Sequence, residues 1–159
     1  MRWPARLFIS ASALVIAAQL IRPERVNPPV HGDLSAPPAI KEMLSRACYD
    51  CHSNQTKWPW YSAIAPMSWW VYRDVERGRQ PLNFSNWSDY AADPGTMNEK
   101  LDKMAKLLDS GAMPPWWYRE LHPESRLTFS DRDAILRWIG VARDPHAQAD
   151  SVYYPEPSQ

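Results

Sequence analysis

The chain of 159 residues contains only two cysteines, Cys48 and Cys51. Structural zinc sites need four ligands, usually supplied as two spaced pairs, so this small number argues against zinc. The 18 Lys and Arg residues balance the 18 Asp and Glu residues, and a net charge of zero does not indicate nucleic-acid binding. No useful run of alternating apolar and polar residues marks a strand, and no internal repeat occurs. These absences favour a single all-α domain with long irregular connections.

Proline and tryptophan are the abundant residue types. Hydrophobic residues make up 45% of the chain, which is typical of a globular protein rather than a disordered one. The 16 prolines favour loops between short helices. The 9 tryptophans suit a core built around a flat ligand, or a small core that needs bulky side chains to fill it.

The first 25 residues have the pattern of an export signal. Arg2 and Arg6 precede the uncharged run 7–21, and Arg22 and Arg25 follow it. A helix over this run would span roughly 22 Å, less than the roughly 30 Å of a bilayer core. No convincing small-x-small cleavage site follows the run, so we favour a retained signal anchor over a cleaved signal peptide. Either interpretation places the rest of the chain outside the cytoplasmic membrane.

Past this segment, the sequence predicts a proline-rich linker over 26–35, a helical domain over 36–145 and a tail over 146–159. Apolar stripes predict helices that begin near Pro37 and near 66, the second ending at Gly78. A third helix is predicted with a capping box of Thr96 and Glu99, and a last one that begins at Ser130 with Asp133 as capping partner. Residues 111–126 contain too many prolines to predict a helix. The predicted buried faces comprise Ile40, Met43, Leu44 and Ala47; Leu101, Met104, Leu107 and Leu108; and Ile135, Trp138, Ile139 and Ala142.

The stretch Cys-Tyr-Asp-Cys-His, residues 48–52, holds both cysteines and an adjoining histidine. A disulfide between them would close a very small loop and constrain little of the unfolded chain. A redox dithiol of this spacing normally lies beside a sheet, and no sheet is predicted. The remaining interpretation is covalent attachment of one haem c, in which two thiols add to adjacent vinyl groups of the porphyrin. His52 then supplies the axial imidazole to the iron.

A second axial ligand would complete the iron coordination. We predict Met113, because Pro114 and Pro115 hold its segment extended and present the thioether without helical crowding. Met67, His122 and an open position remain as alternatives. Met43 and Met104 lie on amphipathic stripes, where methionine more often packs than binds metal.

The aromatic residues between His52 and the last helix are candidates for the wall of a haem pocket. Simple filling of the core explains any one of them equally well. We predict Trp58 and Arg73 as contacts to the haem propionates.

Residues 36–143 resemble a c-type cytochrome domain, and the chain is similar to the exported haem-binding domain family of bacteria. The motifs that carry this likeness are CYDCHSNQTKWPWYS (48–62), AMPPWWY (112–118) and LHPESRLTFSDRD (121–133). The resemblance implies a cytochrome c-like helical fold that binds one haem, with Trp138 packed near Ile40 or Leu44. The stretch between the histidine and Met113 is longer and richer in tryptophan than in small cytochromes c.

Two classes of function follow from these residues. The first is an electron carrier rather than an enzyme, anchored at the periplasmic side of the cytoplasmic membrane, or free in the periplasm if the signal is cleaved. Its partners would be redox proteins, with a fixed relay inside a respiratory complex as a variant of the same role. The second class is a haem sensor of small gases or a peroxidase-like protein, which requires a vacant distal position and a polar residue such as His122.

Overall fold

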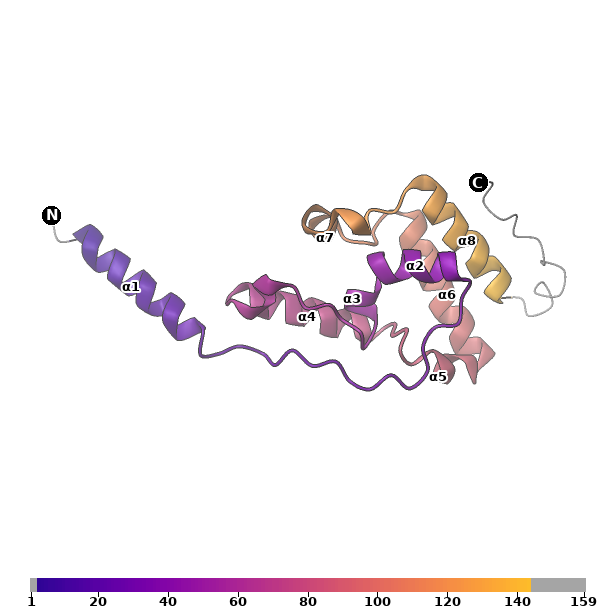
Figure 1. Cartoon of the computed structure of the whole chain (residues 1–159), viewed down its shortest axis with the longest axis horizontal. Coiled ribbons are helices and arrows are strands. Elements are labelled where there is room, and N and C mark those ends of the chain that lie inside the picture. The colour runs from indigo at the N-terminus through magenta and orange to yellow at the C-terminus, as the bar shows by residue number, and fades with distance from the viewer. Residues whose placement is uncertain (1–2, 144–159) are drawn as a thin grey trace.

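The computed structural model describes residues 3–143, which form helices and no β-strand (Figure 1). The prediction of an all-α chain is confirmed for this part, whereas the predicted tail over 146–159 lies outside it. The elements in chain order are α1 (Trp3–Ala18), α2 (Pro38–Ala47), α3 (Tyr49–His52), η1 (Trp60–Ala63), α4 (Met67–Arg79), α5 (Trp87–Ala91), α6 (Pro94–Asp109), α7 (Trp116–Leu121), η2 (Pro123–Ser125) and α8 (Phe129–Arg143).

The N-terminal helix α1 stands at one end of the molecule, away from the other helices (Figure 1). None of its residues is buried, although most of them are apolar. Across residues 3–143, the structure contains no helix with the length and hydropathy required to cross a membrane.

The linker over 26–35 contains no helix and lies along the domain (Figure 1). The backbone N–H groups of His31 and Gly32 both donate to the carbonyl of Ser85, each at 3.0 Å. Gly32 is needed here because a Cβ atom would lie 2.1 Å from Oγ of Ser88. The linker is therefore fixed to the domain surface.

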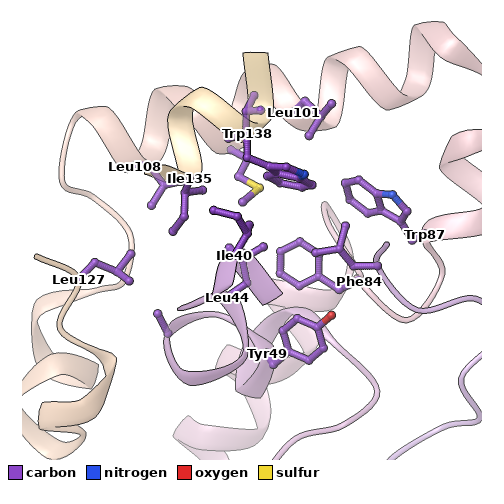
Figure 2. Close-up of a cluster of buried hydrophobic side chains, with 14 residues drawn as sticks. Ile40, Leu44, Tyr49, Phe84, Trp87, Leu101, Leu108, Leu127, Ile135 and Trp138 are labelled. Carbon is purple, nitrogen blue, oxygen red and sulfur yellow. The ribbon is translucent and has the colours of Figure 1, made fainter. Parts of the chain in front are cut away.

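The hydrophobic core lies where α2 and α6 meet α8 (Figure 2). Ile40 and Leu44 of α2 and Trp138 of α8 belong to one buried cluster, as the apolar stripes predict. Burying each such side chain contributes about 1.5–3 kcal/mol. This cluster holds the end of α2, and so fixes where the chain enters residues 48–52.

The N-terminus of α6 lies before the position that the sequence predicts. Asp93 is the capping residue, and its carboxylate accepts hydrogen bonds from the backbone N–H groups of Gly95 and Thr96. Pro94 fits the first helical position, where its missing N–H costs nothing. The predicted capping box of Thr96 and Glu99 is therefore wrong, and Glu99 pairs with Lys103 instead.

The N-terminus of α8 is displaced in the same direction. Thr128 and Asp131 form a reciprocal pair, because each side chain accepts a hydrogen bond from the backbone N–H of the other residue. The carboxylate of Asp131 also binds Arg46 of α2 at 2.6 Å. The predicted start at Ser130 with Asp133 as partner is wrong, and Asp133 pairs with Arg137 one turn further on. The contact with Arg46 of α2 favours Asp131 over Asp133 as the capping partner of α8.

Two further predictions about the helices are wrong. Gly78 lies inside α4, which continues to Arg79, rather than ending it. The proline-rich segment 111–126 contains the short helices α7 and η2. Its prolines precede these helices or begin them, where their fixed φ is tolerated.

Candidate haem site

The two cysteines and the histidine lie within one turn at the junction of α2 and α3. The backbone N–H of Cys48 closes α2 onto the carbonyl of Leu44 at 2.8 Å. The N–H groups of Cys51 and His52 then both donate to the carbonyl of Cys48. The two sulfurs are free and form no disulfide. The fold therefore presents two thiols and one imidazole from a single short segment.

A cavity of about 680 Å³ adjoins this turn, and its wall is mainly apolar. Its volume lies within the range of roughly 300–1,000 Å³ that is typical of pockets for small molecules and cofactors. The wall comes from residues 47–61, from α4 and the segment after it, from α6, and from residues 113–122. Cys48, Cys51 and His52 all line the cavity.

The segment after α4 orients the imidazole of His52. Nδ1 of His52 lies 3.2 Å from the carbonyl oxygen of Leu82, which can only accept, so Nδ1 carries the proton. The backbone carbonyl of His52 accepts from the N–H of Phe84 at 2.7 Å. Burial lowers the pKa of His52, which favours the neutral ring. Nε2 is then the unprotonated nitrogen, which is the arrangement that metal-binding histidines commonly have.

The environment of the sulfurs keeps them as thiols. Burial raises the pKa of Cys48 to about 12, with a smaller effect of the neighbouring Cys51. Burial likewise raises the pKa of Cys51 to about 12. Neither sulfur is therefore activated as a thiolate, which is the form that metal binding and thiol–disulfide exchange require.

Helix α4 lies so close to the turn that holds Cys48, Cys51 and His52 that there is no room for a side chain at position 78. A Cβ atom on Gly78 would lie 2.4 Å from the carbonyl oxygen of Cys51 and 2.9 Å from its carbon. Because both neighbours are backbone atoms, α4 and α3 would have to separate. Gly78 thus permits the contact between α3 and α4 that forms one side of the cavity.

We expect Gly78→Ala to destabilise the protein by about 1–3 kcal/mol, which is typical of overpacking. Gly140→Ala is the matched control: it is exposed, it lies in α8, and a Cβ there would meet nothing within 4 Å. That control should be neutral or stabilise the helix by up to about 1 kcal/mol. Urea unfolding of both variants measures the difference, and equal stabilities would contradict a close approach at Gly78.

All three residues that the sequence predicts as candidates for the distal ligand, Met113, Met67 and His122, line the cavity. Met104 lines it as well, whereas Met43 and Met97 pack against the hydrophobic core. Met104 is also part of that core, as its amphipathic stripe predicts. Met113 follows the end of α6, and its backbone N–H donates to the carbonyl of Leu107 at 3.2 Å.

His122 is already held at both ring nitrogens. Nε2 lies 2.8 Å from the hydroxyl of Tyr61, and Nδ1 lies 3.2 Å from a carboxylate oxygen of Glu124. The ring also stacks on Tyr118 with 4.3 Å between centroids. An axial role for His122 would require Tyr61 to be displaced, so these contacts favour Met113.

Asp50 forms a polar corner of the cavity that the sequence does not reveal. Its carboxylate accepts from the hydroxyl of Tyr118 at 2.7 Å and from the backbone N–H of Lys57 at 2.9 Å. Burial, together with the charge of Asp50, raises the pKa of Tyr118 and keeps its hydroxyl protonated. Asp50 is one of the two residues between the cysteines, and the C-x-x-C-H motif does not specify which residue types stand there.

Trp58 and Arg73 lie elsewhere and do not line the cavity. The indole N–H of Trp58 donates to Oδ1 of Asn27 at 3.2 Å. Arg73 is exposed, with its guanidinium over the ring of Trp70. Their contact with haem propionates stays a prediction. The cations along the cavity are Lys57, Arg77, Lys100, Lys103 and Lys106.

An apolar cavity of this size beside a neutral imidazole and two thiols fits a haem, and defines a helical haem-binding protein. The profile of the family described as "Haem-binding domain" matches residues 13–140, which is most of the chain. The protein belongs to this haem-binding domain family. Comparison with curated proteins and with solved structures found no match. The expected likeness to the cytochrome c fold therefore stays a prediction.

Proposed function

We propose that the protein is a monohaem c-type cytochrome that carries electrons. One observation carries the proposal: two free thiols and a histidine whose Nδ1 contacts a backbone carbonyl line the same large apolar cavity. When bound, haem supplies a one-electron iron centre. Each thiol S–H of Cys48 and Cys51 would add across one vinyl double bond. A carbon–sulfur bond forms, the proton goes to the other vinyl carbon, and no external oxidant is needed.

The other residues of the cavity support this role by their positions. His52 would bind the iron through Nε2, while its contact with Leu82 keeps the ring in place. Met113 would supply a second ligand to the iron, and a histidine–methionine pair raises the iron potential. The apolar side chains of Trp70, Trp117 and other wall residues would exclude water.

We place the protein at the periplasmic side of the cytoplasmic membrane, where it would exchange electrons with redox proteins. The support comes from α1, an apolar helix with no buried residue and with arginines on both sides in the sequence. A single haem is expected, because the chain has one pair of cysteines.

A second candidate function rests on the contacts of His122. A histidine bound to Tyr61 and Glu124 at the cavity wall is the kind of group that a gas sensor or a peroxidase uses above the iron. This alternative needs a distal position that Met113 does not occupy.

Extraction with acidified organic solvent tests the covalent attachment. We expect the purified protein to keep its colour in the aqueous, protein-containing fraction, because thioether bonds survive this treatment. A variant that combines Cys48→Ala with Cys51→Ala should release all of its haem. Complete extraction of haem from the wild-type protein would contradict the proposal.

A further inference from the structure

The exposed apolar side chains of the domain divide into two groups. Met67, Trp70, Leu107, Trp117 and Leu121 line the cavity, so a bound haem accounts for their exposure. A second group does not line it and has no such explanation. Among these, Trp60 is 77% exposed, Ile64 47%, Trp69 41% and Trp116 66%. We call these four residues the tryptophan edge.

Trp60, Ile64 and Trp69 come from η1, the start of α4 and the segment between them, and η1 and α4 contact each other. Trp60 is the first residue of η1, and its neighbour Tyr61 contacts His122 at the end of α7. Trp116 is the first residue of α7. Figure 1 shows η1, the beginning of α4 and α7 on the side of the domain that faces α1.

The chain leaving α1 is bound to this same edge. The side-chain amide of Gln19 forms two hydrogen bonds with Ala65, one to its backbone N–H at 3.0 Å and one to its carbonyl at 3.1 Å. Arg22 donates to the carbonyl of Ala63 at 2.8 Å. The indole of Trp69 donates to the carbonyl of Ile21. The end of the apolar helix is therefore fixed to residues 63–69.

Contacts further along the linker keep the domain in this place. Arg79 donates to the carbonyl of Val26 at 3.1 Å and to Oδ1 of Asn27 at 3.1 Å. Asn54 donates to the carbonyl of Pro29 at 2.7 Å. These contacts hold the domain next to the end of α1, so the surface of a membrane that contained α1 would begin beside residues 63–69.

We propose that the tryptophan edge docks on the lipid surface of the membrane. The inference rests on the proposed membrane attachment through α1. Tryptophan is enriched where lipid meets water, because its ring is apolar and its N–H is polar. Arg22 and Arg25 are exposed in the segment that follows α1 and would face the phosphates of anionic lipids. Docking would bring the cavity rim at Trp70 and Trp117 close to the membrane plane.

Spin labels on the full-length, haem-loaded protein in vesicles test the docking. The vesicles contain phosphatidylcholine with a minority of phosphatidylglycerol. A nitroxide is attached to Trp60→Cys, to Trp116→Cys and, as a matched control, to Phe129→Cys. Phe129 is 88% exposed and begins α8, which packs against α2 and α6 rather than η1, α4 or α7. Relaxation by oxygen, which enters lipid, is compared with relaxation by a water-soluble nickel chelate.

We expect the oxygen-to-nickel relaxation ratio to be severalfold higher at positions 60 and 116 than at 129. Similar low ratios at all three positions would overturn the docking, and so would labels at 60 and 116 that neither reagent reaches, since these would indicate a protein contact. Failure of the chain to float with the vesicles would overturn both the attachment and the docking. Labelling of the wild-type protein reports separately on the proposed haem c, because thioether-bound Cys48 and Cys51 cannot react.

Discussion

Met113→Ala is expected to abolish the weak long-wavelength sulfur-to-iron band of the oxidised protein and to make the reduced protein bind carbon monoxide. In the proposed coordination, the thioether of Met113 would be the soft axial ligand that raises the potential of a histidine-bound haem. Its loss should therefore lower the reduction potential by a substantial part of the roughly 0.8 V range that axial ligands control. The proposed thioether bonds at Cys48 and Cys51 would keep the haem in place during all of these measurements.

The other methionines provide controls for this experiment. Met97 packs against the core and does not line the cavity, so Met97→Ala should leave the band in place. Met67 does line the cavity. Persistence of the band in Met113→Ala, together with its loss in Met67→Ala, would assign the ligand to Met67. Ready binding of carbon monoxide by the reduced wild type would instead favour the sensor or peroxidase alternative.

His52→Ala is expected to remove the low-spin spectrum while leaving the haem attached to the chain. The variant deletes the nitrogen that the contact with Leu82 leaves available to the iron. Added imidazole should restore much of the spectrum, because it is the same ligand without its link to the backbone. Absorption spectra with and without imidazole measure the effect.

His122 is the control, because it is a second histidine on the wall of the same cavity. Its ring nitrogens contact Tyr61 and Glu124, so His122→Ala should retain the low-spin spectrum with the sulfur-to-iron band. The opposite pattern, with His122→Ala altering the spectrum and His52→Ala leaving it unchanged, would overturn the assignment of the axial ligand.

The sequence predicts well what depends on local spacing. The stripe through Ile40 and Leu44 identifies the buried face of α2, because burial follows helical periodicity. The same stripe leads into Cys48, so the turn that carries both thiols follows from neighbouring residues alone. Trp138 joins the same core for the same reason.

The remaining features depend on contacts between distant segments. Gly78 resembles a helix stop in the sequence, yet its role is set by the backbone of Cys51. Asp131 is preferred over Asp133 because it also binds Arg46, 85 residues away. Asp50 becomes part of the site only when Tyr118 folds over it. The pattern of a single sequence does not show which distant residues contact each other in the fold.

The fixed linker also determines how far the cofactor can travel. A free, flexible segment of ten residues would have a root-mean-square end-to-end distance of about 17 Å, and its domain would sample a hemisphere around the helix end. The hydrogen bonds of Arg79, Asn54 and Gly32 remove that freedom. The domain would therefore not carry its haem from a donor to an acceptor by motion on a flexible linker. Lateral diffusion of the whole chain, or of its partners, would have to bring each pair of redox centres together.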